Sequence, residues 1–189
     1  MAMTEPIRDK KTLQQLANYW HKQGNFRNYA LIVLGVCTVL RPGDLLRLTW
    51  EDVYDFERGT FRSHITVKEN KTGKSKTIAL NKQAVNALQK LLPHRRSEYV
   101  FASNRKDGKA ISRVQAWRII RISADAIGAA CRIALYSLRK TAGYHAWKVG
   151  VSPVVLMDIY NHSSFSVTRR YLGVSQDDRD AVYLGMALF

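Results

Sequence analysis

A histidine and a tyrosine stand nine positions apart near the C-terminus, His162 and Tyr171, in the stretch NHSSFSVTRRY. A tyrosine hydroxyl becomes an effective nucleophile only when neighbouring cations stabilise its phenolate. Arg169 and Arg170 directly precede Tyr171, and His162 is a third candidate. Tyrosines are also common at the ends of amphipathic helices, so this stretch alone favours a structural tyrosine. The chemical interpretation requires further cations, suited to a phosphate, elsewhere in the chain.

Arg41 is the first of these cations. It follows an apolar segment, FRNYALIVLGVCTVL from Phe26, which predicts a buried central helix too short to cross a membrane. Pro42 then suits the first turn of a short helix. Arg41 is therefore held beside a buried element, where it either pairs with an acid such as Asp44 or binds an anion. Taken alone, the structural pairing is favoured.

Lys71 and Arg139 are the other two cations. Residues 61–68 alternate apolar and polar side chains and residues 77–80 can form a partner strand, which predicts a hairpin with Lys71 at its lysine-rich turn. Such a turn is usually a solvated loop, although on a basic protein it can approach a phosphate. Ser137 is the expected N-cap of a later helix, which places Arg139 in a first turn whose free N–H groups favour an anion.

Helical periodicity and capping residues predict the elements that must position these side chains. Further helices are expected from Asp9 to Gly24, from Asn81 to Pro93, from Ser112 to Ile127, from Ser137 to Gly150, from Ser152 to Tyr160 and from Ser175 to Phe189. The predicted fold class is mainly α with a small antiparallel β-sheet (α+β). We expect residues 1–189 to form one domain, with a disordered tip over residues 1–8 and a tail helix over residues 174–189.

The chain is strongly basic, with 30 Lys and Arg against 15 Asp and Glu and a formal charge of +15. This excess predicts a polyanionic partner, with nucleic acid ahead of an acidic membrane surface. No apolar run reaches the roughly 18 residues of a membrane span, and no leader opens the chain, so a cytoplasmic protein is expected. No cluster of His, Cys or carboxylate residues has metal-ligand spacing, so neither a metal nor another cofactor is expected.

These motifs, in this order, resemble the catalytic domain of the tyrosine recombinases, the phage integrase family. The first family box, an arginine followed three positions on by an acid and then by L-x-x-L-x-W-x-D, stands here as RPGDLLRLTWEDV from Arg41. The hairpin lysine falls on Lys71 in NKTGKSKTIAL, and the second box, usually H-x-x-R, falls on residues 136–139. The usual L-G-H-S-S falls on residues 160–164, and the family tyrosine on Tyr171. The resemblance covers the chain from about Ala30 to its end.

The resemblance implies a metal-independent reaction on a DNA phosphate. Tyr171 would attack the phosphorus and form a 3′-phosphotyrosyl link, and Lys71 would protonate the departing 5′-oxygen. Arg41 and Arg139 would clamp the phosphate with their guanidinium groups. His162 would add a hydrogen bond to the same oxygens. The implied activity is site-specific recombination or integration.

Three positions depart from the family pattern. Asp44 stands where glutamate is commoner, and Asn161 stands where glycine is commoner. Tyr136 stands where a histidine is usual, which puts proton transfer at that position in doubt, because a phenol is a weaker proton acceptor than an imidazole. Tyr136 could instead position Tyr171 or a phosphate oxygen.

The resemblance also implies partners. Family members act on double-stranded DNA as tetramers, in some cases with accessory DNA-bending proteins, and the last helix packs on a neighbouring protomer. The apolar side of residues 181–189 suits that arrangement, and packing within the same chain is the alternative. Most members carry an N-terminal core-binding domain, whereas here about 25 to 30 residues precede the buried helix. We therefore expect either a fragment of a longer integrase or a short recombinase resembling the fimbrial inverting enzymes, in the bacterial cytosol or nucleoid.

Three other functions are alternatives to the recombinase. Type IB topoisomerases share the cations and the tyrosine, although the order of the boxes and the small size favour the recombinases. A non-catalytic DNA-binding relative would keep the basic face, and Tyr136 is the feature that favours it. A basic scaffold unrelated to DNA would require all the motif matches to be coincidence.

Overall fold

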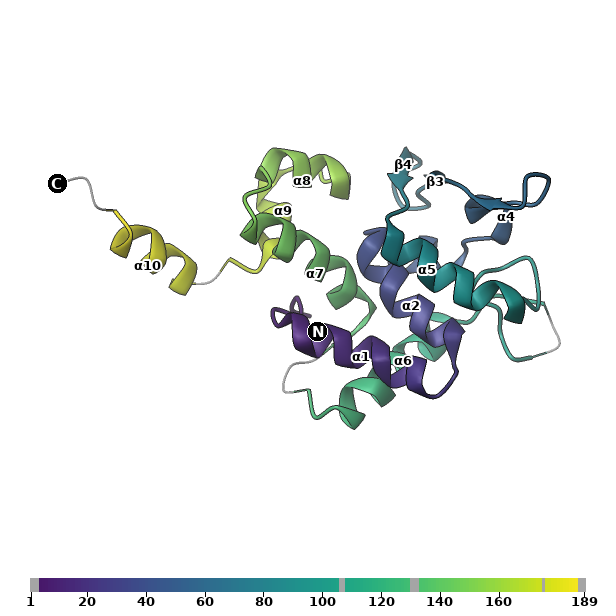
Figure 1. The fold of residues 1–189 in the computed structure, drawn as a ribbon. Helices are drawn as coiled ribbons and strands as arrows, with labels where there is room; N and C mark the ends of the chain where they lie inside the picture. The colour runs from purple at the N-terminus through teal and green to yellow at the C-terminus, as the bar shows by residue number, and fades with distance from the viewer. Residues whose placement is uncertain (1–3, 106–107, 130–132, 175, 187–189) are drawn as a thin grey trace.

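The computed structural model describes residues 4–105, 108–129, 133–174 and 176–186. It is mainly helical with two small antiparallel sheets, which confirms the predicted fold class (Figure 1). The helices are α1 (Lys10–Lys22), α2 (Phe26–Cys37), α3 (Pro42–Leu46), α4 (Trp50–Val53), α5 (Lys82–Leu91), the 3-10 turn η1 (Leu92–His94), α6 (Arg113–Ala126), α7 (Leu135–Lys148), α8 (Pro153–Tyr160), α9 (Phe165–Leu172) and α10 (Gln176–Leu184). None of these described helices is both long and apolar enough to cross a bilayer.

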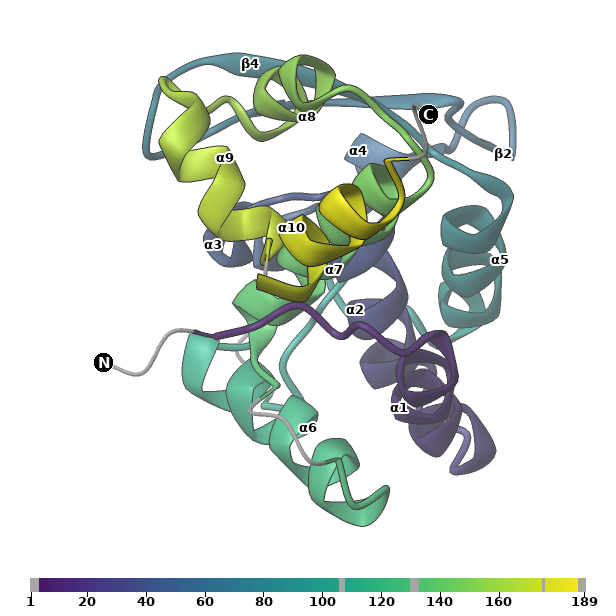
Figure 2. The same ribbon diagram turned by 90° about the vertical axis from the view of Figure 1, so that its left-hand side faces the viewer.

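Helix α2 is the centre of the fold, as its apolar sequence predicts. It contacts α1, α5 and α7, which surround it in Figures 1 and 2. Gly35 of α2 faces α7, and a Cβ atom there would lie 2.7 Å from Cδ1 of Leu138. The missing side chain therefore allows α2 and α7 to pack closely. Since Leu138 directly precedes Arg139, this contact fixes the position of that arginine relative to the end of α2.

The predicted hairpin is formed by β3 (His64–Lys68) and β4 (Ser75–Ala79), which pair antiparallel. A second small sheet pairs β1 (Tyr54–Asp55) with β2 (Thr60–Phe61). Ile65 and Ile78 are cross-strand partners and are both buried, so one face of the hairpin packs on the core. The lysine-rich turn between β3 and β4 extends from this anchored base.

Helices α7, α8 and α9 position His162 and Tyr171. Leu156 of α8, Tyr160 at its end and Leu172 of α9 make a small buried cluster, against which Tyr171 packs. Figure 2 shows α8 and α9 next to each other and beside α7. Asn161 ends α8 with φ of 52°, a left-handed conformation that asparagine tolerates better than most residues. The sharp turn there directs His162 back toward α7.

The N-terminal segment differs from the disordered tip expected over residues 1–8. Residues 1–3 lie outside the described residues, but Ile7 is buried in the core, and its N–H donates to Oγ1 of Thr141 at 2.9 Å. Arg8 donates to the carbonyl oxygen of Gly173 at 3.2 Å. The buried Ile7 side chain and several hydrogen bonds therefore hold residues 4–8 along α7 and the end of α9.

The start of α7 differs from the predicted one. Helix α7 begins at Leu135 with Ala134 as N-cap, so the prediction of Ser137 as N-cap is wrong. The Oγ of Ser137 instead accepts the N–H of Ala134 at 3.2 Å. Arg139 consequently lies beyond the first turn, and the argument from free N–H groups around it does not hold. The predicted cap of the tail helix, Ser175, lies outside the described residues.

The tail helix α10 lies at the edge of the molecule in Figure 1. Its side chains Val182, Tyr183 and Leu184 are exposed by 63%, 71% and 88%, so the described residues leave this apolar side uncovered. Its packing on a neighbouring protomer remains a prediction.

Candidate active site

Arg139 is the most deeply buried cation of the site, with 1% of its surface exposed. Its guanidinium donates to the carbonyl oxygen of Val39, just after α2, and to that of Tyr160 at 2.8 Å. Its Nε is buried without a partner among the described residues. Burial, and then the charge of Arg41, lower the pKa of Arg139 from its ordinary value. Arg139 thus joins α2, α7 and α8 and keeps unused N–H donors.

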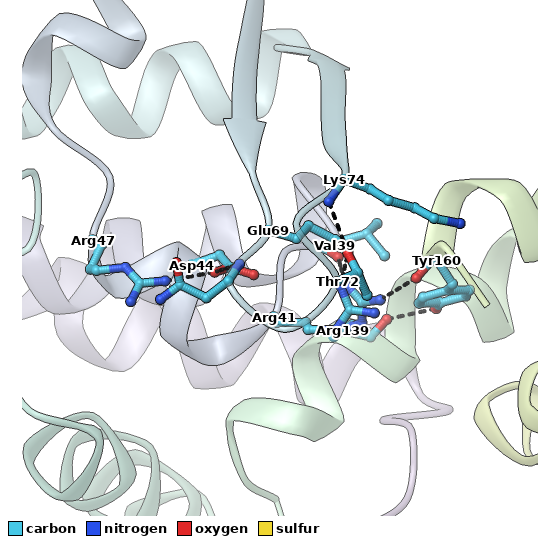
Figure 3. A network of polar contacts seen from close by, with 10 residues as sticks. Val39, Arg41, Asp44, Arg47, Glu69, Thr72, Lys74, Arg139 and Tyr160 are labelled. Carbon is cyan, nitrogen blue, oxygen red and sulfur yellow. Dashed lines mark hydrogen bonds and ion pairs between the residues drawn. The ribbon is translucent and has the colours of Figure 1, made fainter. Parts of the chain in front are cut away.

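Arg41 lies next to Arg139 but pairs with an unexpected acid. Its guanidinium forms an ion pair with Glu69, whose side chain is fully buried at the end of the hairpin strand (Figure 3). The pairing with Asp44 that was favoured from sequence is wrong. Asp44 accepts from Arg47 at 2.8 Å and from the backbone N–H of Asn70 at 3.2 Å. Asp44 therefore connects α3 to the hairpin turn, and Arg41 pairs with Glu69 instead.

Glu69 is held as a carboxylate. Burial alone raises the pKa of the Glu69 carboxyl, but the donor groups of Thr72 and Arg41 outweigh burial and leave the pKa below its ordinary value. The hydroxyl of Thr72 donates to it at 2.8 Å. One carboxylate oxygen is thus shared by Arg41 and Thr72, while the other is buried without a hydrogen-bond partner in the described chain.

His162 lies between two tyrosine rings. It stacks on Tyr160 with ring centroids 5.0 Å apart and an interplanar angle of 9°, and its centroid is 4.6 Å from that of Tyr171. Its Nδ1 is 2.9 Å from Oγ1 of Thr168. Burial, and then the charges of Arg139 and Arg41, lower the pKa of His162 to about 4. At neutral pH the free protein therefore offers an uncharged imidazole, which can form a hydrogen bond but carries no charge.

Tyr171, in the last turn of α9, is half-buried beside these groups. The guanidinium carbon of Arg139 is 5.9 Å from its ring centroid, and Nζ of Lys140 is 5.4 Å from it. The cations beside Tyr171 therefore come from α7. Arg169 and Arg170, which precede it in sequence, have exposed side chains. Neighbouring residues of a helix point about 100° apart, so adjacency in sequence does not bring their charges to the phenol.

Lys71 and Tyr136 stand at the rim. Lys71 is exposed on the hairpin turn, close enough for its charge to contribute to lowering the pKa of His162. Tyr136 is 45% exposed and makes no hydrogen bond or ring contact in the part of the chain that the structure describes. It precedes Arg139 by three residues and so shares a face of α7 with it. His145, six residues after Arg139 on the same helix, contacts the carbonyl oxygen of Ile7 at 3.1 Å.

Comparison with known proteins identifies the arrangement. Residues 8–177 match the phage integrase family, most of the chain's length. The chain belongs to this family. The probable integrase/recombinase YoeC of Bacillus subtilis is 36% identical over 186 residues, which cover 97% of each chain. The type 1 fimbriae regulatory protein FimE of Escherichia coli is 28% identical over 152 residues, 77% of this chain and 73% of that protein.

Solved structures of a recombinase and of an integrase share the fold. The XerA recombinase superposes with a TM-score of 0.78 at 21% identity, covering 97% of this chain and 64% of XerA. A lambda integrase dimer bound to a COC′ core site gives a TM-score of 0.70 at 19% identity, covering 95% of this chain and 62% of that chain. This integrase-family chain therefore spans somewhat less than two thirds of the length of these solved proteins. The family and the fold predicted from the motifs are confirmed.

Several residues of the candidate site were not predicted from the sequence. They are Glu69, Thr168, Tyr160, Lys140 and Lys76, all of which lie among or beside the predicted side chains. The strand alternation contains a signal for two of them. Glu69 continues the inward positions of Ile65, and Lys76 precedes the inward Ile78 by two residues. For the other three, only the tertiary packing brings the side chain to the site.

The ion pair of Glu69 predicts an acid-sensitive contribution to stability. A carboxyl with a lowered folded pKa stabilises the protein above its ordinary pKa of 4.5, and this stability is lost as the pH falls below that value. We expect Glu69→Gln to lose up to about 3 kcal/mol at neutral pH, because the charge of Arg41 loses its partner. Chemical denaturation between pH 3 and pH 7 would show the variant with a flatter pH dependence than the wild type.

Glu51, an exposed acid of α4, provides the control for this experiment. Glu51→Gln should follow the wild-type pH dependence throughout. A Glu69→Gln variant with the wild-type stability profile would mean that the ion pair contributes nothing to folding.

Proposed function

We propose that this chain is a tyrosine-type site-specific recombinase that cuts and rejoins double-stranded DNA through a 3′-phosphotyrosyl intermediate. The observation that carries the proposal is the meeting of His162 and Tyr171, whose rings are in contact beside the buried guanidinium of Arg139. The three residues come from α7, the α8–α9 turn and α9. The net charge of +15 supports DNA as the partner.

In the proposed cleavage step, the phenolate oxygen of Tyr171 attacks the scissile phosphorus after its proton passes to water. A P–O bond to the tyrosine forms and the bond to the 5′-oxygen breaks. Lys71 gives a proton to the departing oxygen, which leaves as a 5′-hydroxyl. Attack by the 5′-hydroxyl of another strand reverses these steps and releases Tyr171. The phosphotyrosyl bond conserves the energy of the phosphodiester, so religation needs no ATP.

The proposed phosphate site uses fixed donors for the charge that develops on the non-bridging oxygens. Arg139 presents its unused N–H groups, and Arg41 turns toward the phosphate from its pairing with Glu69. Neutral His162 adds a hydrogen bond. If the hydroxyl of Thr168 donates to Nδ1, the proton of the imidazole is on Nε2 and is available for the phosphate.

The proposed assembly is a homo-oligomer on DNA, a tetramer during strand exchange, in which the uncovered apolar side of α10 packs on a neighbour. The solved relatives include XerH bound to a difH substrate and the lambda integrase dimer bound to DNA. The names of the relatives favour recombination over the topoisomerase, the non-catalytic DNA-binding protein and the unrelated scaffold. Accessory DNA-bending proteins and a location in the bacterial cytosol belong to the same proposal.

A trapping experiment tests the proposal. DNA from the regions that flank the coding sequence, nicked so that the short 5′-hydroxyl fragment diffuses away, is incubated with the protein, and SDS-resistant complexes are collected. We expect a covalent adduct whose sequencing reveals the target site. DNA binding without any adduct would contradict the catalytic proposal, and relaxation of supercoils without strand exchange would favour a topoisomerase.

Tyr136→His provides a test of the unusual residue in the second box. Because Tyr136 is 45% exposed and makes no hydrogen bond or ring contact with the described residues, the replacement should not disturb folding. An imidazole accepts a proton more readily than a phenol, so the variant should form the adduct at least as fast as the wild type. Single-turnover adduct formation on the trapped target measures this. A variant that cleaves no better than Arg139→Ala would remove Tyr136 from the proposed site.

A further inference from the structure

Lys76 is a partly buried lysine, with a buried Nζ, on the hairpin strand beside the candidate site. It lies on β4 opposite Val67 of β3, two residues before the buried Ile78, so its side chain belongs to the inner face of the hairpin. Lys68 and Lys74, by contrast, are exposed. The lysine-rich hairpin thus carries one lysine inward, and this lysine is distinct from Lys71 at the turn.

The ammonium group of Lys76 has no partner in the described chain. Its Nζ is buried and forms neither a hydrogen bond nor an ion pair with any described residue. A buried ammonium without a hydrogen-bond partner destabilises the folded protein. Such a group is typical of a binding site, in which the ligand provides the missing acceptor. Among the described residues, the lysine therefore has three unused donors enclosed beside the site.

The charged groups that face Lys76 are those of the proposed phosphate site. They are Arg139 of α7, Glu69 at the end of β3 and Arg41 before α3. Burial, and then repulsion from Arg139 and Arg41 against the attraction of Glu69, lowers the pKa of Lys76 to about 8. Glu69 is already paired with Arg41, so a single carboxylate lies among the three cations Arg41, Lys76 and Arg139. This local excess of positive charge is suited to an anion.

We propose that Lys76 is a third cation of the phosphate site, whose ammonium group contacts a non-bridging oxygen of the scissile phosphate together with Arg41 and Arg139. The inference rests on the proposed recombinase function and adds a residue to its site. The phosphate supplies the acceptor that Nζ lacks in the free protein. Glu69 remains with Arg41 or takes a hydrogen bond from Lys76 as the hairpin adjusts to DNA.

The first test needs no cleavage. The melting temperature of the full chain is measured with increasing inorganic phosphate, at constant ionic strength maintained with chloride. Phosphate should raise the melting temperature of the wild type, and Lys76→Met should lose most of this rise. Lys68→Met removes the same charge from the exposed side of the same hairpin and should respond like the wild type. An equal response of Lys76→Met and wild type would overturn the proposal, whatever the outcome of the trapping experiment.

The second test measures the stability of the wild type and of Lys76→Met without phosphate as a function of pH, which also shows that the variant folds. A lysine with a lowered folded pKa destabilises the protein most below pH 8, and stability recovers as the pH rises from about 8 toward the ordinary value of 10.5. Lys76→Met should therefore be more stable than the wild type at neutral pH and should lack this rise. A less stable Lys76→Met would show that the ammonium is satisfied in the free protein and would contradict the proposal.

The role in the reaction is tested on the trapped DNA target. We expect adduct formation by Lys76→Met to fall by about 10²–10³-fold, with partial recovery in Lys76→Arg and none of this loss in Lys68→Met. A substrate with sulfur in place of the bridging 5′-oxygen needs no proton donor, so it should rescue Lys71→Met but not Lys76→Met. Rescue of Lys76→Met by sulfur would assign proton donation to Lys76 and overturn the phosphate contact.

Discussion

Tyr171→Phe is expected to abolish the covalent DNA adduct while leaving DNA binding intact. The variant loses the hydroxyl that would bond to phosphorus, and a phenyl ring has no nucleophilic atom to replace it. The ring should keep its packing, because the aromatic ring and not the hydroxyl makes the contacts with His162 and Tyr160. The ring centroids of these pairs are 4.6 Å and 5.2 Å apart. Loss of the adduct can then be attributed to chemistry rather than to unfolding.

The measurement is the yield of SDS-resistant complex on the nicked target, together with DNA binding at low salt. Tyr183→Phe is the matched control, because Tyr183 is a second C-terminal tyrosine, exposed by 71% on α10. It should form the adduct like the wild type. Tyr160 is an unsuitable nucleophile, since it is fully buried and its hydroxyl donates to the carbonyl oxygen of Arg139 at 2.8 Å. An adduct that persists in Tyr171→Phe would show that another residue attacks the DNA.

The second large effect is expected at Arg139, whose guanidinium serves both the fold and the proposed phosphate site. Arg139→Lys keeps the charge, but a single ammonium cannot reach both carbonyl oxygens and a phosphate with a fork of donors. We expect adduct formation to fall by about 10²–10³-fold, as when one oxyanion donor is removed. Single-turnover kinetics on the trapped target, with thermal unfolding in parallel, would measure both consequences.

Arg139→Ala should be worse, because it also leaves the carbonyl oxygens of Val39 and Tyr160 without this donor in a buried position. The expected loss of stability is about 3–5 kcal/mol, the usual range for removing one partner of a buried charged contact. Arg121, whose exposed side chain pairs with Asp125 at 2.7 Å, provides the control. Arg121→Ala should cost at most about 1 kcal/mol. Wild-type cleavage by Arg139→Lys would remove this arginine from the phosphate site.

The sequence by itself determined the elements whose signals are local. Asn81 and Ser112 cap α5 and α6 as predicted, and Asp9 caps α1 where that helix was expected to begin, because a cap depends on hydrogen bonds within one turn. The apolar run of α2 predicted its burial. The order of the motifs predicted the family, and the structure brings Arg41, Arg139, His162 and Tyr171 into one region. The start of α7 was misplaced by about one turn, because Ser137 also bonds to a backbone N–H from inside the helix.

Only the tertiary structure decided which charges meet. Asp44 is three residues from Arg41, yet the hairpin brings Glu69 to Arg41 and leaves Asp44 to Arg47. The cations next to Tyr171 likewise come from α7 rather than from its sequence neighbours. Helical and strand geometry fix the direction of a side chain, but packing between elements fixes what it points toward. Ion pairs and pKa shifts depend on distances and burial between distant segments, so residue order alone cannot specify them.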